Sequence, residues 1–307
     1  MTNKLLSNLK RLFQPRAIKP EVAFQEPDPS NVTKELDKIT IPVDTRSIGY
    51  SSPHINVGYG LSPGKQRSHN EDAFFTLTTM FSFNETEIPF GLYVVADGMG
   101  GHKNGEIASE LAIRTVVGTI LTEIYTPMMS LNPEPSELSF REVFQKGIEQ
   151  ANSEIIKNSY GGGTTVTAVL IVGEQMTIAH VGDSRVYAIA EDSTMEALTR
   201  DHSLVKRLQE LGQITPEEAA VHPQRNVLYR ALGQGEPFDP EIISTTRPES
   251  GSILVCSDGL WNIVGQDGLR SIIKSAVSPQ DICDRMIDAA NDAGGPDNIS
   301  AILVEFS

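Results

Sequence analysis

The chain has 307 residues, of which 39% are hydrophobic, enough for one large domain or two small ones with a sizeable buried core. Its formal net charge of −15 argues against nucleic acid as the main partner, because neutralising a phosphate backbone requires a basic face. No apolar stretch approaches the ~18 residues of a membrane span and no signal peptide is evident, so we expect a cytoplasmic protein.

The N-terminal segment differs in charge from the rest of the chain. Residues 1–20 carry five bases and no acid, which leaves −20 for the remainder. Leucines and Phe13 fall on one face of a short helix that Pro15 would end. This pattern fits a weak contact with an anionic membrane surface or a docking helix, and it also fits a frayed tail. We favour the tail, because helices this short are marginal alone.

A linker separates this basic segment from the folded part of the chain. Residues 20–55 are rich in Pro, Asp, Glu, Ser and Thr and show no sustained hydrophobic period. We therefore expect residues 1–54 to form a basic arm and a disordered linker, and residues 55–307 to form one folded domain.

Within the folded part, apolar runs predict strands at residues 92–96, 166–172, 176–181, 185–189, 253–256 and 299–304. Several of these runs are apolar throughout, as expected when both faces of a sheet are covered. Helical patterns predict helices over residues 106–122, 140–157, 267–275 and 279–293, and the proline-containing stretch 123–139 predicts a surface connection. The grouping indicates an α+β fold with a two-sheet core and helices outside.

Acidic residues recur on turns beside the predicted strands. Asp97 ends the run 92–96 and precedes Gly98, and Asp258 precedes Gly259 just after the run 253–256. The same setting holds for Asp183 in HVGDSR, for Asp297 in GGPDN and for the pair Glu71 and Asp72 that ends RSHNED. Each acid alone is typical of an ordinary turn, because Asp favours turns for local hydrogen-bond reasons. Their recurrence in one setting favours a shared site.

Carboxylates that converge raise one another's pKa unless cations lie among them. Oxygen ligands suit hard ions such as Mg²⁺ or Mn²⁺, and zinc is disfavoured because no His or Cys cluster accompanies the acids. Cys256 and Cys283 lack metal-site spacing and are expected to be small buried hydrophobes. Two such ions ~3.5–4 Å apart lower the pKa of a bridging water, which can attack phosphorus without a protein nucleophile.

Other phosphate chemistries have no motif in this chain. Neither a C-x5-R loop nor a G-x-S-x-G elbow is present. The sequence GGGTT at residues 161–165 lacks the Gly-Lys of a P-loop, so we read it as a turn before a strand. Arg67, four residues before Glu71, could hold two oxygens of a phosphate dianion in a bidentate fork, whereas without the neighbouring acids it would be an ordinary surface arginine.

Taken together these segments resemble the metal-dependent serine/threonine protein phosphatases of the type 2C or PPM family. The resemblance covers roughly residues 55–306 and is carried by eight motifs in the family's order: RSHNED (67–72), VVADGMGGHKNGEIAS (94–109), GTTVTAVLI (163–171), AHVGDSRVY (179–187), LTRDHSLV (198–205), YRALG (229–233), VCSDGLWNIV (255–264) and GGPDNISAILV (294–304). Any one motif is weak, but the ordered set is specific. The resemblance implies a four-layer α-β-β-α sandwich, in which two antiparallel sheets are flanked by helix pairs and metals lie in a cleft between the sheets.

The resemblance also implies roles for single residues. Asp97 matches the ligand that bridges both metals, and Gly98 offers a backbone carbonyl to the second metal. Asp258 and Asp297 match ligands of the first metal. Glu71 matches the acid that holds the second metal, largely through water.

Further roles follow from the same resemblance. Asp183 matches a ligand of a third, weaker metal site found in bacterial members, which Asp258 would share. Arg67 matches the phosphate clamp, and Asp72 matches an acid behind the metal ligands that orients this end of the site. Residues 202–230 resemble the flap beside the cleft, which in the family affects substrate choice.

One departure from the eukaryotic pattern concerns proton transfer. Eukaryotic members usually place a histidine after the Asp-Gly of the second motif, where this chain has Met99 as bacterial members do. Methionine cannot carry a proton, so a metal-bound water or another group must protonate the leaving oxygen. This departure predicts a bacterial-type enzyme.

The resulting prediction is hydrolysis of phosphoserine and phosphothreonine in proteins by a water activated in a binuclear Mg²⁺ or Mn²⁺ centre. The family implies signal transduction in opposition to a serine/threonine kinase. We expect phosphoproteins as partners, no nucleic acid, and a monomer. The alternative is a catalytically silent metal-binding regulatory or interaction module of the same fold, although such proteins typically lose ligands and none is lost here.

Overall fold

The computed structural model describes residues 55–83, 86–100, 103–130, 138–235 and 239–306. The predicted basic arm and linker, residues 1–54, lies outside the described residues. No helix within the described ranges is both long and apolar enough to cross a membrane.

The core consists of two antiparallel sheets. One sheet has five strands in the order β1-β11-β10-β7-β8, and the other has six, with β2-β3-β5-β6-β9 in line and β4 paired to the end of β3. The bounds of the first sheet are β1 Ile55–Ser62, β7 Arg185–Ile189, β8 Met195–Ala197, β10 Gly251–Cys256 and β11 Ile299–Phe306. Those of the second are β2 Asp72–Phe83, β3 Thr86–Met99, β4 Gly163–Thr164, β5 Val166–Val172, β6 Gln175–Val181 and β9 Glu241–Thr246.

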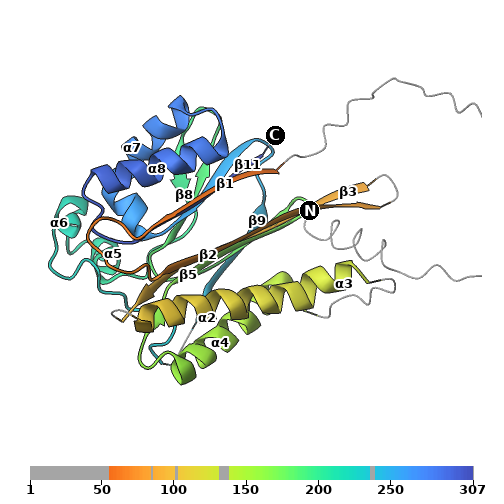
Figure 1. The fold of residues 1–307 in the computed structure, drawn as a ribbon, viewed down its shortest axis with the longest axis horizontal. Coiled ribbons are helices and arrows are strands. Elements are labelled where there is room, and N and C mark those ends of the chain that lie inside the picture. Colours follow the sequence, from red (N-terminus) through yellow and green to blue (C-terminus); the bar gives the residue numbers. More distant parts are fainter. Residues whose placement is uncertain (1–54, 84–85, 101–102, 131–137, 236–238, 307) are drawn as a thin grey trace, which may run out of the picture. The chain divides into compact units, whose positions relative to one another are not determined.

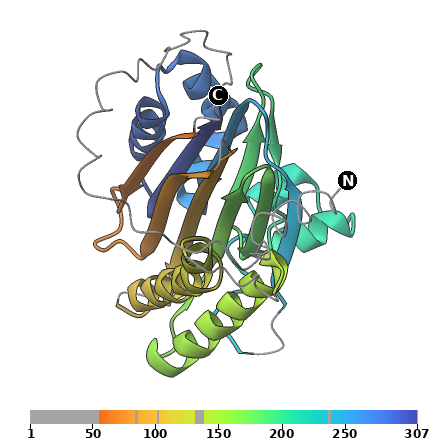
Figure 2. The same cartoon turned by 90° about the vertical axis from the view of Figure 1, so that its right-hand side faces the viewer.

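Helices cover the outer face of each sheet (Figures 1 and 2). The second sheet carries α2 (Lys103–Ile120), its extension η2 (Leu121–Tyr125) and α3 (Thr126–Met128), and α4 (Phe140–Asn158). The first sheet carries α7 (Asp258–Ser275) and α8 (Pro279–Asp292). Two short helices, α5 (Leu204–Glu210) and α6 (Pro216–Ala220), lie at one end of the sandwich, on the left in Figure 1. The expected four-layer α-β-β-α sandwich is confirmed.

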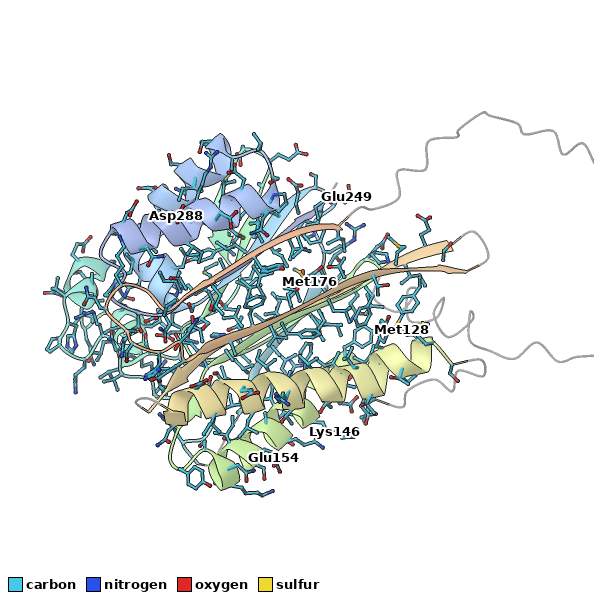
Figure 3. All side chains as sticks on the ribbon, viewed as in Figure 1. Met128, Lys146, Glu154, Met176, Glu249 and Asp288 are labelled. Carbon is cyan, nitrogen blue, oxygen red and sulfur yellow. The ribbon has the colours of Figure 1, made fainter. Side chains whose placement is uncertain are left out.

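Three apolar layers hold this sandwich together. Alternate residues of β3 face opposite ways, so that Leu92 and Val94 pack under α2 and α4 while Tyr93 and Val95 pack against the other sheet. A third cluster joins α7 and α8 to the first sheet. Because the central strands are buried on both faces, their sequences are apolar without alternation. Figure 3 shows side chains filling the space between the sheets, where Met176 is labelled.

Several predicted elements have the observed bounds. The strands at residues 166–172 and 185–189 match β5 and β7 at both ends. The predicted start of α4 at Phe140 is confirmed by a capping box, in which the Ser139 hydroxyl accepts the Glu142 N–H and the Glu142 carboxylate accepts the Ser139 N–H. A serine followed three residues later by glutamate is the sequence signal for such a start.

One predicted connection was wrong in part. Residues 123–128 are helical rather than a surface connection, because Ile124 is buried and Tyr125 packs against the core cluster. The Thr126 N–H donates to the Leu121 carbonyl five residues earlier, which is the hydrogen bond of a π-helical turn. This turn continues the helix as far as Pro127. The predicted helix 267–275 lies in the second piece of α7, and the piece from Asp258 to the break at Gly265 (φ 68°) was not predicted.

The packed layer between the sheets predicts how substitutions there change the free energy of unfolding. Ile302 lies in the middle of β11, is fully buried and belongs to the inter-sheet cluster. We expect Ile302→Ala to lower the free energy of unfolding by about 2–5 kcal/mol, because it leaves a cavity between two stiff sheets, and Ile302→Val to lower it by about 0.5–1.5 kcal/mol. Urea unfolding measures both variants. Equal losses for the two would contradict a tightly packed inter-sheet layer.

Candidate active site

The acids predicted to converge do converge on one pocket. They come from the loop before β2, the end of β3, the turn between β6 and β7, the start of α7 and the turn before β11. The pocket has a volume of about 250 Å³ and is lined by Arg67, Glu71, Asp97, Gly98, Met99, Asp183, Asp258, Asp297 and Asn298, among others. Only Asp72 of the predicted acids does not line it, and this side chain is buried behind the pocket.

Asp97 is held by backbone hydrogen bonds on both sides. Its N–H donates to the Thr165 hydroxyl (3.0 Å), and its carbonyl accepts from the Thr165 N–H (2.9 Å) and from the Thr164 hydroxyl (2.9 Å). The sequence predicted Asp97 just beyond a strand, but β3 continues to Met99, and Asp97 lies opposite Asp72 of β2 within the ladder. The carboxylate is therefore carried by a paired strand rather than by a free turn.

The glycines around Asp97 permit close packing of backbone. A side chain at Gly105 would place its Cβ 2.0 Å from the Glu71 carboxylate oxygen Oε2, and a Cβ at Gly98 would lie 2.3 Å from the Gly105 carbonyl. The Gly98 N–H donates to the Glu71 carbonyl (3.1 Å). Glycine at these two positions lets the first turn of α2 approach the strand end and the Glu71 carboxylate.

Asp72 joins three elements behind the pocket. Its Oδ2 accepts from the hydroxyls of Ser257 (2.8 Å) and Ser300 (2.6 Å), which precede α7 and lie in β11. Its Oδ1 is a buried atom without a hydrogen-bond partner among the described residues. Burial raises the pKa of Asp72 to about 7, although the two hydroxyls oppose the shift. Asp72 thus links β2 to the segments that carry Asp258 and Asp297.

Asn298 is a site residue to which the sequence assigned no role. Its side-chain oxygen accepts the Glu71 N–H (2.8 Å), and its amide nitrogen donates to the carbonyls of Pro63 (3.0 Å) and His69 (2.9 Å). It therefore fastens the loop that carries Arg67 and Glu71 to the start of β11. An asparagine directly after Asp297 was visible in the sequence, but its partners are more than 200 residues away.

Arg67 lies at the pocket and is paired with an acid of the site. Its Nη2 donates to Asp297 Oδ2 (2.9 Å), and this hydrogen bond raises the pKa of the guanidinium further. About half of the Arg67 side chain (53%) is exposed, so other guanidinium nitrogens remain accessible from solvent.

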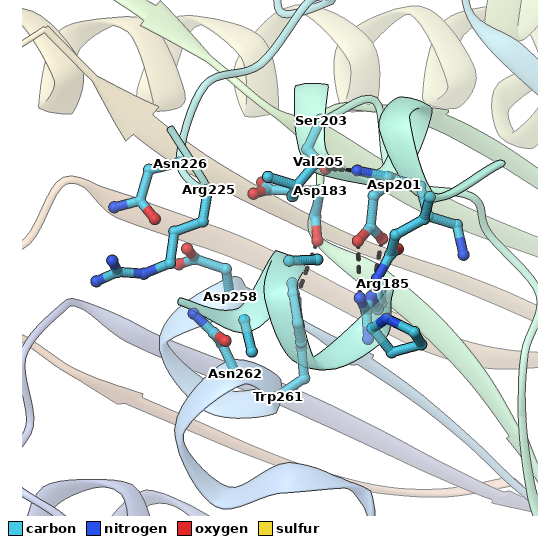
Figure 4. Close-up of a pocket in the computed structure, with 15 residues that line it drawn as sticks. Asp183, Arg185, Asp201, Ser203, Val205, Arg225, Asn226, Asp258, Trp261 and Asn262 are labelled. Atoms are coloured by element: carbon cyan, nitrogen blue, oxygen red, sulfur yellow. Dashed lines mark hydrogen bonds and ion pairs between the residues drawn. The ribbon is translucent and has the colours of Figure 1, made fainter. Parts of the chain in front are cut away.

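Asp183 lies where this pocket meets a second one, shown in Figure 4. Its backbone carbonyl accepts from the Trp261 indole N–H (3.0 Å). The Arg185 guanidinium covers the Trp261 ring at 3.3 Å and makes a bidentate pair with Asp201 (2.8 and 2.7 Å). The polar and charged groups of Arg185, Asp201 and Trp261 beside Asp183 are therefore paired with one another or with the backbone.

Burial and mutual repulsion perturb the carboxyl groups of the site. The pKa of Asp97 lies well above its ordinary value, through burial and then through the charges of Asp72 and Asp258. The pKa of Asp183 is also well above normal, for burial and for the charge of Asp258. The pKa of Asp258 is raised to about 6 by burial and by Asp297, although a hydrogen bond with Asp97 opposes the shift. Without a cation, this site favours protons among its carboxyl groups.

The donor set fits hard divalent cations. It consists of carboxylate oxygens and backbone carbonyls, as Mg²⁺ and Mn²⁺ require, and among the described residues that line the pocket Arg67 is the one cation. In the described part of the chain, no three acidic, histidine or cysteine side chains already stand close enough together to hold an ion. Binding would therefore require carboxylate side chains to turn within the pocket.

The chain is similar to known proteins in both sequence and fold. A family model described as protein phosphatase 2C matches residues 60–299. The serine/threonine phosphatase stp of Listeria innocua is 37% identical over 251 residues, which cover 79% of this chain and 92% of that protein. The crystal structure of the S. agalactiae serine/threonine phosphatase aligns with a TM-score of 0.67 and 32% identity, covering 82% of this chain and 99% of that one. The catalytic domain of the phosphatase PstP, solved in complex with two manganese ions, aligns with a TM-score of 0.63 and 26% identity, covering 83% and 99%.

The raised carboxyl pKa values predict a pH-dependent effect of metal on stability. Folded Asp258 and Asp72 bind protons more tightly than in the unfolded chain, where an aspartate has a pKa near 3.9. This stability is fully present below about pH 4 and is lost as the pH rises through about 6 and 7, with a slope of up to about 1.4 kcal/mol per pH unit for each group.

We therefore expect saturating Mn²⁺ to raise the melting temperature more at pH 7.5 than at pH 5.5, because the metal relieves repulsion that protons relieve at low pH. Scanning calorimetry in chelator and in Mn²⁺ at both pH values measures the difference. A stabilisation that is the same at both would contradict this account of the site.

Proposed function

Since the chain belongs to the protein phosphatase 2C family and is a protein serine/threonine phosphatase, we propose that its acidic pocket hydrolyses phosphoserine and phosphothreonine with two divalent cations as cofactors. The observation that carries the proposal is the convergence of five acids from five separate segments on the pocket that also contains Arg67. When bound, Mg²⁺ or Mn²⁺ would supply a water of lowered pKa and positive charge for the phosphoryl oxygens.

The residues that would hold the two cations are those of the pocket. Asp97, which is fixed at both backbone groups, is suited to lie between the two ions, with the Gly98 carbonyl and Glu71 on one side. Asp258 and Asp297 would hold the other ion. Asp183, at the junction with the second pocket, would hold a third ion more weakly. Asp72 has its place behind them and positions Asp258 through Ser257.

Arg67 is proposed to bind the phosphate of the substrate. Its guanidinium carries five N–H donors, so the bond to Asp297 leaves others for phosphate oxygens. The same bond orients the guanidinium toward the acids, where the phosphorus must lie for attack by water. Arg67 thus both recognises the dianion and draws it to the metal ligands.

Protonation of the leaving oxygen requires a proton donor. Met99 lines the pocket at the position where the eukaryotic pattern has one, and its sulfur accepts a weak hydrogen bond from the Gln234 amide (3.5 Å). None of the described residues that line the pocket is a histidine. We propose that water delivers this proton.

We also propose a broader setting for this activity. Phosphoproteins are the substrates, a serine/threonine kinase is the opposing activity, and the enzyme acts as a cytoplasmic monomer in signal transduction. Residues 55–307 form the phosphatase domain, and residues 1–54 form the arm that precedes it. The rival function, a silent metal-binding module, would keep the same acids without phosphate release.

Loss of a metal ligand should abolish turnover. We expect Asp258→Asn and Asp97→Asn to lower kcat for an aryl phosphate and for a phosphothreonine peptide by about 100-fold or more in Mn²⁺, since each removes a charge that holds the cation. Chelator should have the same effect on the unmodified protein. Asp267→Asn, on a side chain of α7 that is 99% exposed, is the matched control.

Calorimetric titration with Mn²⁺ separates the two candidate functions. Retained Mn²⁺ binding without phosphate release from any peptide by the unmodified protein would favour the silent module. Undiminished turnover in Asp258→Asn would rule out the metal-ligand assignment.

Replacement of Arg67, the proposed phosphate-binding residue, should weaken substrate binding. We expect Arg67→Ala to raise KM for a phosphothreonine peptide about tenfold, because charge-assisted hydrogen bonds to the phosphate are lost, and Arg67→Lys to recover only part of it. Arg114→Ala, on an exposed face of α2, should leave KM unchanged. Steady-state kinetics measures each variant, and an unchanged KM in Arg67→Ala would exclude this residue from phosphate binding.

A further inference from the structure

The turn that carries Asp183 is hydrogen-bonded to His202, which lies in the motif LTRDHSLV (198–205). The Gly182 N–H donates to His202 Nδ1 (3.1 Å), and the Gly182 carbonyl accepts from the His202 N–H (2.7 Å). Gly182 has φ +111°, a conformation in which other residues are strained, and a Cβ there would lie 2.4 Å from a Thr165 side-chain carbon. Both backbone hydrogen-bonding groups of Gly182 are therefore paired with His202.

The second ring nitrogen of His202 faces an acid outside the active-site pocket. Because Nδ1 accepts a hydrogen bond, the ring proton of the neutral side chain lies on Nε2. Nε2 is 3.9 Å from Glu241 Oε2, which is a buried atom without a hydrogen-bond partner in the described part of the chain. Burial and the neighbouring His180 lower the pKa of His202 to about 3, which keeps the ring neutral. His180 stacks beside it at 4.9 Å and lies opposite Glu241 in the sheet.

On its other side the turn is bonded to the residue that fixes Asp97. The hydroxyls of Ser184 and Thr165 share a hydrogen bond of 2.9 Å. The Thr165 hydroxyl accepts the Asp97 N–H, so its own proton is free for Ser184. The connection thus runs without a break from His202 through the Gly182–Ser184 turn and Thr165 to Asp97.

His202 also holds the segment that closes this side of the pocket. Its carbonyl accepts from the Tyr229 N–H (2.9 Å), and Leu228, the preceding residue, lines the active-site pocket. The Tyr229 ring lies 5.7 Å from the imidazole. His202 is therefore hydrogen-bonded both to the turn that carries Asp183 and to the far end of the 202–230 segment.

We propose that His202 is a positioning residue that sets Asp183 against Asp97 and Asp258 for cation binding and phosphoester hydrolysis. The inference rests on the proposed function of the pocket. His202 touches neither substrate nor cation and acts through the Gly182 backbone. Its acceptor at Nδ1 is the essential feature, since a side chain without one would leave a buried N–H unsatisfied.

Two near-isosteric variants separate the acceptor from the shape of the ring. Asparagine can place its Oδ1 where the imidazole has Nδ1, whereas leucine fills the space without an acceptor. We expect His202→Leu to lower kcat for an aryl phosphate about tenfold and to weaken the last Mn²⁺ binding step in calorimetric titration by a similar factor, while His202→Asn stays within about threefold of the unmodified protein. Glu241→Leu should show a smaller loss than His202→Leu, because it leaves both hydrogen bonds between His202 and Gly182 in place.

A double-mutant cycle with Asp183→Asn tests whether His202 acts through that turn. If it does, His202→Leu should reduce kcat no further once Asp183 has been replaced. Amide exchange at Gly182 in metal-free protein gives a readout that does not depend on activity, and we expect faster exchange in His202→Leu than in His202→Asn.

Three results would overturn the proposal: unchanged Mn²⁺ binding and kcat in folded His202→Leu, equal defects in the Asn and Leu variants, or losses that multiply with Asp183→Asn. The proposed function fails separately, because in that case the unmodified protein itself would release no phosphate.

Discussion

The organisation of this protein depends on the repulsion among carboxylates that are buried together. Asp97 and Asp258 share a hydrogen bond, Asp72 lies behind them, and the pKa of each is raised by burial and by nearby acids. Such a cluster is unfavourable in an apolar interior unless protons or cations neutralise it. The same repulsion that destabilises the metal-free site would favour the proposed binding of divalent ions, which would neutralise it.

The sandwich holds these mutually repelling carboxylates close together. Strands buried on both faces hold Asp97 in a ladder, and the turns at that end of the two sheets bring in acids from the loop before β2, the β6–β7 turn, α7 and the turn before β11. Neutral hydrogen bonds then fix the carriers rather than the carboxylates, with Asn298 on the loop before β2, Thr165 on Asp97 and His202 on the Asp183 turn. The segments that carry Glu71, Asp97 and Asp183 are therefore positioned through backbone groups rather than through their carboxylates.

Much of this could be predicted from the sequence, for identifiable reasons. Strands such as 166–172 are apolar without a break, and the start of α4 carries a capping box, so local signals determined both. The acids were identifiable because they recur beside glycines at strand ends. The helix through Pro127 was missed because tertiary packing overrode the proline signal, and the piece of α7 before Gly265 was missed because it is short and ends at that glycine. Asn298 and His202 could not be assigned roles, since their partners are distant in the chain and are ordinary backbone groups.

The central claim is that these distant acids seat a pair of divalent cations. The most direct measurement is anomalous diffraction at the manganese edge from crystals soaked in Mn²⁺. The account predicts two strong peaks in the pocket, with Asp97 between them and Asp258 and Asp297 on one of them. A map without peaks there, or with manganese bound only at exposed surface acids, would contradict it.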